Sequence, residues 1–83
     1  MNINLAISHG SKILSKKFIP NSQLDSEILM AKIINKDRNY ISLNSKIFLN
    51  KNDLRGFFNL IEQRSLGHPM EFYRDQYLHC DFS

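Results

Sequence analysis

The sequence has few of the residues that build disulfide frameworks, membrane spans or secretory leaders. Its 83 residues include one cysteine, Cys80, which cannot form an internal disulfide, so we expect a protein of the reducing cytoplasm. No apolar run approaches the roughly 18 residues that cross a bilayer. The beginning of the chain is interrupted by Asn2, Asn4 and His9, whereas a leader would have an apolar core there. These absences argue against a membrane-spanning or exported protein.

Sites for nucleotides and metals are missing as well. Gly10, Gly56 and Gly67 lie too far apart to form a loop that cradles phosphate. The side chains that could bind a transition metal lack the paired spacing of a tetrahedral site; they are His9, His68, His79 and Cys80. We therefore expect no bound metal, no cofactor and no nucleotide hydrolysis.

Two groups of reactive side chains could suggest catalysis, but their spacing argues against it. His79, Cys80 and Asp81 are consecutive, and adjacent residues rarely converge on one reacting atom. Asp25 and Glu27 would point in different directions on a helix, so they could not share a proton. We interpret these two acids as partners of the helix dipole and of solvent, and we expect no catalytic residue.

The chain does contain enough apolar material for one small folded domain. Hydrophobic residues make up 42% of it and charged residues 23%, with a net charge of +3. Four segments repeat apolar residues at intervals of three and four, which is typical of helices; they are residues 4–18, 23–34, 38–43 and 51–65. We predict an all-α bundle of four to five helices over residues 1–69, followed by an irregular tail over residues 70–83.

The first predicted helix has one apolar side, which consists of Ile3, Ala6, Ile7, Ile13, Leu14 and Phe18. Gly10 lies on the same side, where it would let a neighbouring helix approach closely. Pro20 excludes helical backbone at the residue before it. Asn21 and Ser22 then offer side-chain oxygens that could cap the second helix.

The second predicted helix is apolar on more than one side, so we expect it to lie centrally and touch neighbours on two sides. Asn35 suits the left-handed conformation that ends a helix, and Asp37 can cap a short third helix. That third helix would turn its apolar residues toward the core; they are Tyr40, Ile41 and Leu43.

The fourth predicted helix has clear signals at both ends. Asn50 suits the N-terminal cap, Gly67 would stop the helix, and Pro69 would prevent it from resuming. The preceding connection would be held to the bundle by its apolar side chains, Ile47, Phe48 and Leu49.

The interior should form where the second and fourth helices meet, through Ile28, Ala31, Phe57 and Ile61.

Several segments resemble those of a known family in their order and spacing. Residues 24–31 read LDSEILMA and residues 35–38 read NKDR, where the family has an L-D-x-E-x-L-L-A helix and a G-K-x-R turn. Leu49 and Asn50 are similar to its L-[ST] helix entry. A further set matches its F-x-x-L-x-x-R-x-x-G-x-P exit: Phe57, Leu60, Arg64, Gly67 and Pro69. The chain resembles the amino-terminal domain of the release-factor glutamine methyltransferases, long called the HemK family.

The resemblance implies a helical domain that helps to hold a class I peptide chain release factor while a second, Rossmann-like domain methylates a glutamine. The chain ends before any glycine-rich turn for S-adenosylmethionine and before an N-P-P-Y sequence. We therefore expect a domain that is not catalytic on its own, with S-adenosylmethionine bound only in the missing domain. Its partner would be a release factor or a separately encoded methyltransferase domain.

The exit from the fourth helix departs from the family pattern. The family's G-E-P-φ-x-Y, where φ is apolar, is replaced by GHPMEF over residues 67–72. Alternatively, EFY over residues 71–73 corresponds to a later E-F-[WY] of the family, which requires a small deletion after Met70. We expect a partner or the neighbouring domain to contact the exposed side of the fourth helix and its exit, at Arg64, Gly67, Pro69 and Phe72.

A second hypothesis is a small independent helical protein that binds nucleic acid. Five lysines could form a basic strip across neighbouring helices: Lys12, Lys16, Lys17, Lys32 and Lys36. No aromatic residue alternates with them as a stacking platform, because the aromatics sit at core spacing. An ordinary solvated face is therefore the better interpretation, and we do not expect nucleic acid as a partner.

Overall fold

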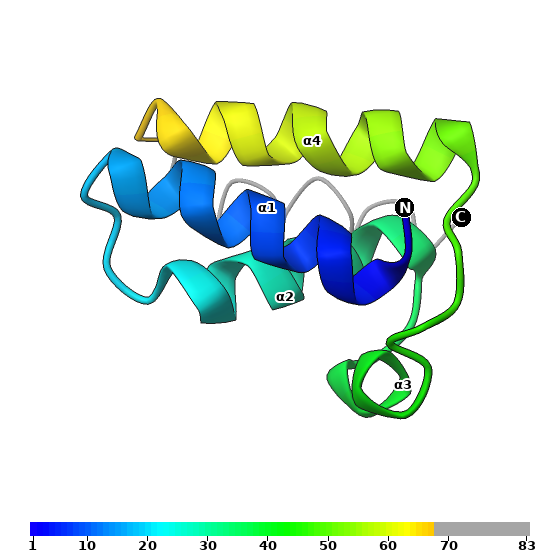
Figure 1. Ribbon diagram of the computed structural model, residues 1–83. Helices are drawn as coiled ribbons and strands as arrows, with labels where there is room; N and C mark the ends of the chain where they lie inside the picture. Colours follow the sequence, from blue (N-terminus) through cyan, green and yellow to red (C-terminus); the bar gives the residue numbers. More distant parts are fainter. Residues whose placement is uncertain (68–83) are drawn as a thin grey trace, which may run out of the picture.

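The computed structural model describes residues 1–67, which fold into four helices (Figure 1). They are α1 (Ile3–Lys16), α2 (Ser22–Ile34), α3 (Arg38–Leu43) and α4 (Lys51–Ser65). The all-α prediction is confirmed, and the helices begin and end within two residues of the predicted bounds. The predicted tail over residues 70–83 lies outside the described part of the chain. None of the helices in residues 1–67 is both long enough and apolar enough to span a bilayer.

Three helices lie side by side, and the short α3 is set apart from them (Figure 1). α2 runs antiparallel to α1 and α4, and α1 packs against α4 as well as against α2. α2 also contacts α3, so it touches three other helices. The predicted central position of α2 is therefore confirmed.

The core lies between α1, α2 and α4, and α3 contributes Ile41 to it. Its buried apolar side chains are Ile3, Ala6, Ile7, Leu14, Leu29, Met30, Ile41, Phe57, Leu60 and Ile61. Phe57 and Ile61 are fully buried as predicted, and Ala31 packs against the core from a half-buried position. Ile28 is also only half-buried, because α2 turns Ser26, Leu29 and Met30 inward. Apolar residues lie on more than one side of α2, so its sequence pattern could not define which side faces the interior.

Gly10 is a point of close approach between the three long helices. A Cβ atom there would lie 2.8 Å from Cδ1 of Ile61, 2.8 Å from Oγ of Ser26 and 2.9 Å from Cζ of Phe57. The buried Ser26 hydroxyl is satisfied, because it donates to the carbonyl of Ile7 at 2.8 Å. The predicted close approach at Gly10 is confirmed, and the residue of α2 that faces it is Ser26.

Phe18 is not on the buried side of α1, and that prediction is wrong. α1 ends at Lys16, and Phe18 has a φ of 60° and a side chain that is 93% exposed. The amide of Phe18 donates to the carbonyl of Ser15, and that of Ile19 to the carbonyl of Leu14. This is the Schellman arrangement, which places a left-handed residue just beyond the helix, usually a glycine. The chain must reverse here, and the reversal points the Phe18 ring into solvent.

Two other left-handed residues flank α2. Asn35 ends the helix with a φ of 58°, as predicted. Asn21 has a φ of 57° at the start, and its side chain makes no capping hydrogen bond, so its predicted capping role is wrong. A left-handed residue aims its side chain away from the first-turn amides, whereas working caps have extended backbone.

The caps of α3 and α4 are as predicted. The Asp37 carboxylate accepts a hydrogen bond from the amide of Tyr40 at 2.8 Å, and the Asn50 side chain accepts one from the amide of Asp53 at 2.7 Å. Gly67 follows α4 with a φ of 100°, a left-handed value that suits glycine and ends the helix.

The connection between α3 and α4 is held by its backbone. The carbonyls of Ile47 and Ser45 accept hydrogen bonds from the amides of Ile3 and Asn4, at 3.0 and 2.9 Å. These amides open α1 and have no partner within the helix. The side chains of Ile47 and Phe48 are 45% and 76% exposed, so only Leu49 packs inward as predicted.

Leu43 is also exposed, at 84%, although we predicted it to face the core. It follows the buried Ile41 by two residues, which places it on the opposite side of the short helix α3.

Candidate interaction surface

One flank of α4 carries a shallow hollow of about 650 Å³. It is lined by Met1, Leu54, Arg55, Phe58, Asn59 and Glu62. Most of these residues form two neighbouring rows on the helix, at spacings of four. The side of α4 that packs on α1 and α2 buries Phe57, Leu60 and Ile61. The hollow therefore lies beside the buried side of α4, where Leu54 and Phe58 still pack against the core.

The hollow combines an apolar centre with charged edges. Leu54 and Phe58 are half-buried, whereas Arg55, Asn59 and Glu62 are exposed. The Phe58 ring meets Phe57 edge to face, with 5.1 Å between ring centroids, so its position is fixed from below. A surface of this kind can accept an apolar side chain and pair charges at its rim.

Arg64, one of the predicted contact residues, is engaged inside the domain. Its Nε and Nη2 atoms lie 3.2 and 3.1 Å from Oδ2 of Asp25, and the side chains are 15% and 9% exposed. The pair joins the last turn of α4 to the first turn of α2, where each charge also complements a helix dipole. The interpretation of Asp25 as a solvated side chain is therefore wrong.

Glu27 has different partners from Asp25, which agrees with the expectation that the two side chains point in different directions. Its carboxylate lies 2.9 Å from Nη2 of Arg38 and accepts a further hydrogen bond from Gln23 at 2.9 Å. The Glu27–Arg38 pair joins α2 to the beginning of α3. The two carboxylates thus serve two separate helix contacts.

Of the other predicted contact residues, Gly67 lies one turn beyond Arg64 at the exit of α4. Pro69 and Phe72 lie outside the described residues, so their role stays a prediction. Sequence reasoning pointed to the exposed side of α4 but did not single out the residues of the hollow. The spacing of Leu54 and Phe58 by four residues, beside the buried Phe57 and Ile61, could have indicated it.

The five lysines of the nucleic-acid hypothesis do not form one strip. Lys12, Lys16 and Lys17 are exposed on α1 and just beyond its end. Lys32 and Lys36 lie toward the opposite end of the hairpin formed by α1 and α2 (Figure 1). Lys36 is engaged there, because its ammonium lies 5.3 Å from the centroid of the Tyr40 ring.

The fold and this surface define a small all-α domain whose described residues contain no cluster of three or more metal-binding side chains. Comparison with known families then identifies it. The chain belongs to the family of PrmC N-terminal domains, whose model matches residues 6–72.

Two relatives agree with that assignment. The chain is 30% identical over 70 residues to a release factor glutamine methyltransferase of Leptospira interrogans, covering 84% of this chain and 24% of that protein. It is 31% identical over 84 aligned residues to a bifunctional methyltransferase of Rickettsia felis, covering 93% of this chain and 16% of that protein. The chain thus spans a quarter or less of the relatives that it matches. No solved structure is significantly similar to it.

Proposed function

We propose that this chain is the release-factor-binding domain of a release factor glutamine methyltransferase and is not catalytic on its own. Its membership of the PrmC N-terminal domain family carries the proposal. The similarity covers only a small part of each related methyltransferase, so that methyl transfer and S-adenosylmethionine binding would belong to the rest of such a protein. The domain would act in the cytoplasm, where it meets a class I release factor.

The hollow on α4 is the surface that supports this role best. It is apolar at its centre, charged at its edge and built on a helix that is fixed by the core. Sites on rigid elements hold a partner more accurately than sites on loops. The hollow lies on the same helix as the exit at Gly67, and Gly67 is part of the sequence pattern of the family. The partner would be a release factor, or a separate methyltransferase domain that contacts the exit of α4.

The test is a calorimetric titration of the purified chain with a purified class I release factor. Asn59→Trp fills the hollow from an exposed position and should weaken binding at least tenfold, because it blocks the surface whatever charges the partner carries. Asn39→Trp is the matched control, since Asn39 is exposed on α3, on the other side of α2 from α4 (Figure 1).

Tight binding by the parent and the Asn39→Trp variant, with loss in Asn59→Trp, supports the proposal. Absence of binding by the parent chain up to high micromolar concentrations would contradict it. Binding of a separate methyltransferase domain, with the same sensitivity to Asn59→Trp, would assign the hollow to that partner.

A further inference from the structure

The positive charge of the molecule is concentrated in its first 24 residues. They contain Lys12, Lys16 and Lys17 and no aspartate or glutamate. In the rest of the chain eight basic residues are matched by eight acidic ones, so the net charge of +3 resides in this first segment. Such an asymmetry favours polyanionic partners.

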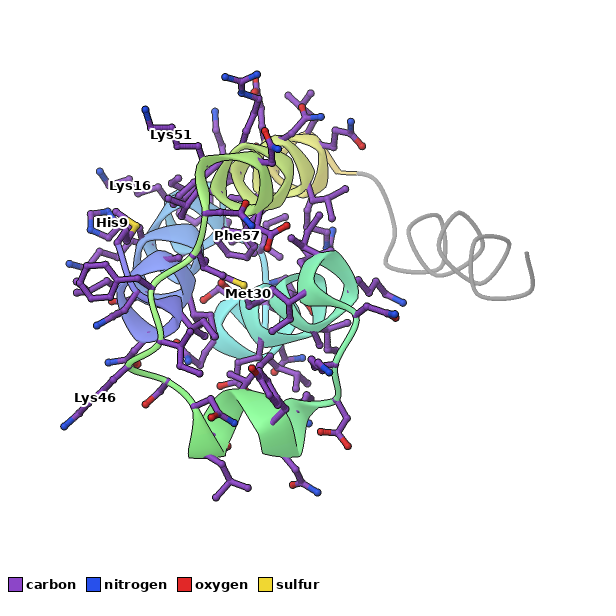
Figure 2. The ribbon with its side chains drawn as sticks, turned by 90° about the vertical axis from the view of Figure 1, so that its right-hand side faces the viewer. His9, Lys16, Met30, Lys46, Lys51 and Phe57 are labelled. Carbon is purple, nitrogen blue, oxygen red and sulfur yellow. The ribbon has the colours of Figure 1, made fainter. Side chains whose placement is uncertain are left out.

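The structure gathers these lysines at one corner of the fold. Lys12 and Lys16 are one turn apart on α1, so they lie on the same side of the helix, and Lys17 follows at its end. All three side chains are exposed. Figure 2 shows His9 and Lys16 projecting from the same side of α1, away from α2 and α4.

No acid of the adjacent helix α2 pairs with these lysines. Asp25 is bonded to Arg64, and Glu27 to Arg38 and Gln23. The positive potential of the corner is therefore not cancelled by either of these carboxylates.

Phe18 adds an exposed aromatic ring at the residue that follows Lys17. It is 93% exposed and adopts a left-handed backbone conformation, which a bulky residue rarely does. Glycine or asparagine would end the helix there with less strain. The aromatic residues were expected to sit at core spacing, and the exposed Phe18 ring departs from that expectation. An exposed ring among cations is the arrangement that stacks on a base while lysines neutralise phosphates.

We propose that Lys12, Lys16, Lys17 and Phe18 form a binding site for single-stranded RNA, with one base on the Phe18 ring and phosphates on the lysines. A membrane fits less well, because insertion needs a long apolar helix side and the apolar side of α1 is consumed by the core. An acidic protein segment also fits less well, because it has no bases to stack on the exposed Phe18 ring.

The test is fluorescence anisotropy of the full chain with a labelled oligouridylate about 12 nucleotides long. We expect a dissociation constant of tens of micromolar at low salt, as for sequence-independent binding. The logarithm of the association constant should fall with that of salt concentration with a slope of about −2, because each neutralised phosphate on a single strand contributes about −0.7.

Two variants separate the roles of ring and charge. Phe18→Asn removes the ring and keeps the left-handed turn, so it should weaken binding on the order of tenfold with the salt slope unchanged. It should also unfold at a higher temperature than the parent, so the loss would not reflect misfolding. Lys16→Gln should reduce the slope by about 0.7.

Lys46→Gln is the control, since Lys46 is an exposed lysine whose neighbours Ser45 and Ile47 bond to the first turn of α1, at the other end of that helix from Lys16. This variant should change neither the affinity for RNA nor the slope of its salt dependence. Unchanged affinity in Phe18→Asn, or an equal loss in Lys46→Gln, would overturn the site. Binding to phosphatidylserine vesicles without binding to RNA would assign the corner to a membrane and overturn the proposal as well. Release-factor binding should survive Phe18→Asn, so the two proposals fail independently.

Discussion

The two sides of α2 are joined to their neighbours by different physical means. Toward α4, Asp25 and Arg64 form an ion pair whose side chains are 9% and 15% exposed, beside the close contact at Gly10. Toward α3, Glu27 and Arg38 form a pair whose side chains are 26% and 56% exposed. Solvent screens the second pair and hardly reaches the first. We therefore expect contacts among α1, α2 and α4 to contribute most of the free energy of unfolding, and those of α3 to contribute little.

Breaking the buried pair should have the largest effect. Arg64→Met leaves the Asp25 carboxylate without its cation in a buried place, which should cost about 3 kcal/mol of unfolding free energy. Arg38→Met removes the corresponding cation on the α3 side and should cost less than about 0.5 kcal/mol. Urea denaturation followed by circular dichroism measures both. Equal losses in the two variants would show that the two sides of α2 are not different.

The close contact at Gly10 should come next. Gly10→Ala places a Cβ within 3 Å of Ile61, Ser26 and Phe57, and we expect a net loss of about 2 kcal/mol after the gain in helix propensity. Gly56→Ala is its matched control on α4, where the new Cβ meets only Cδ1 of Ile33, at 3.1 Å. That variant should be neutral or slightly stabilising. Thermal denaturation of the pair tests this, and tolerance of alanine at residue 10 would mean that the helices are farther apart than described.

The turn after α1 should give the smallest change, and in the opposite direction. Phe18→Asn relieves a left-handed phenylalanine and should stabilise the fold by about 0.5 kcal/mol. Asn35→Ala, at the equivalent position after α2, should destabilise it by a similar amount or more. A lower melting temperature for Phe18→Asn would show that the ring contributes to the fold.

The sequence could predict contacts within one helix turn but not contacts between residues far apart in the chain. Asn35, Asp37, Asn50 and Gly67 act within one turn of their own helices, so their roles were readable from neighbouring residues. The Asp25–Arg64 pair joins residues 39 positions apart, and no local pattern announces it.

The direction of the side chains was the second feature that the sequence could not predict. Phe18 fits the helical spacing of α1, but the chain reversal that follows places it in solvent. Apolar residues lie on more than one side of α2, so its orientation is fixed by tertiary contacts such as those of Ser26 with Gly10 and Ile7. The hollow on α4 depends on the packing of Met1 beside residues 54–62, which the sequence alone does not bring together.

The most direct test of the binding role is nuclear magnetic resonance of the labelled chain during titration with a class I release factor. We expect the amide signals of residues 54–62 to shift or broaden first, while those of α3 and of residues 12–18 stay in place. Changes confined to α3 or to the corner at Phe18, with α4 unaffected, would contradict it.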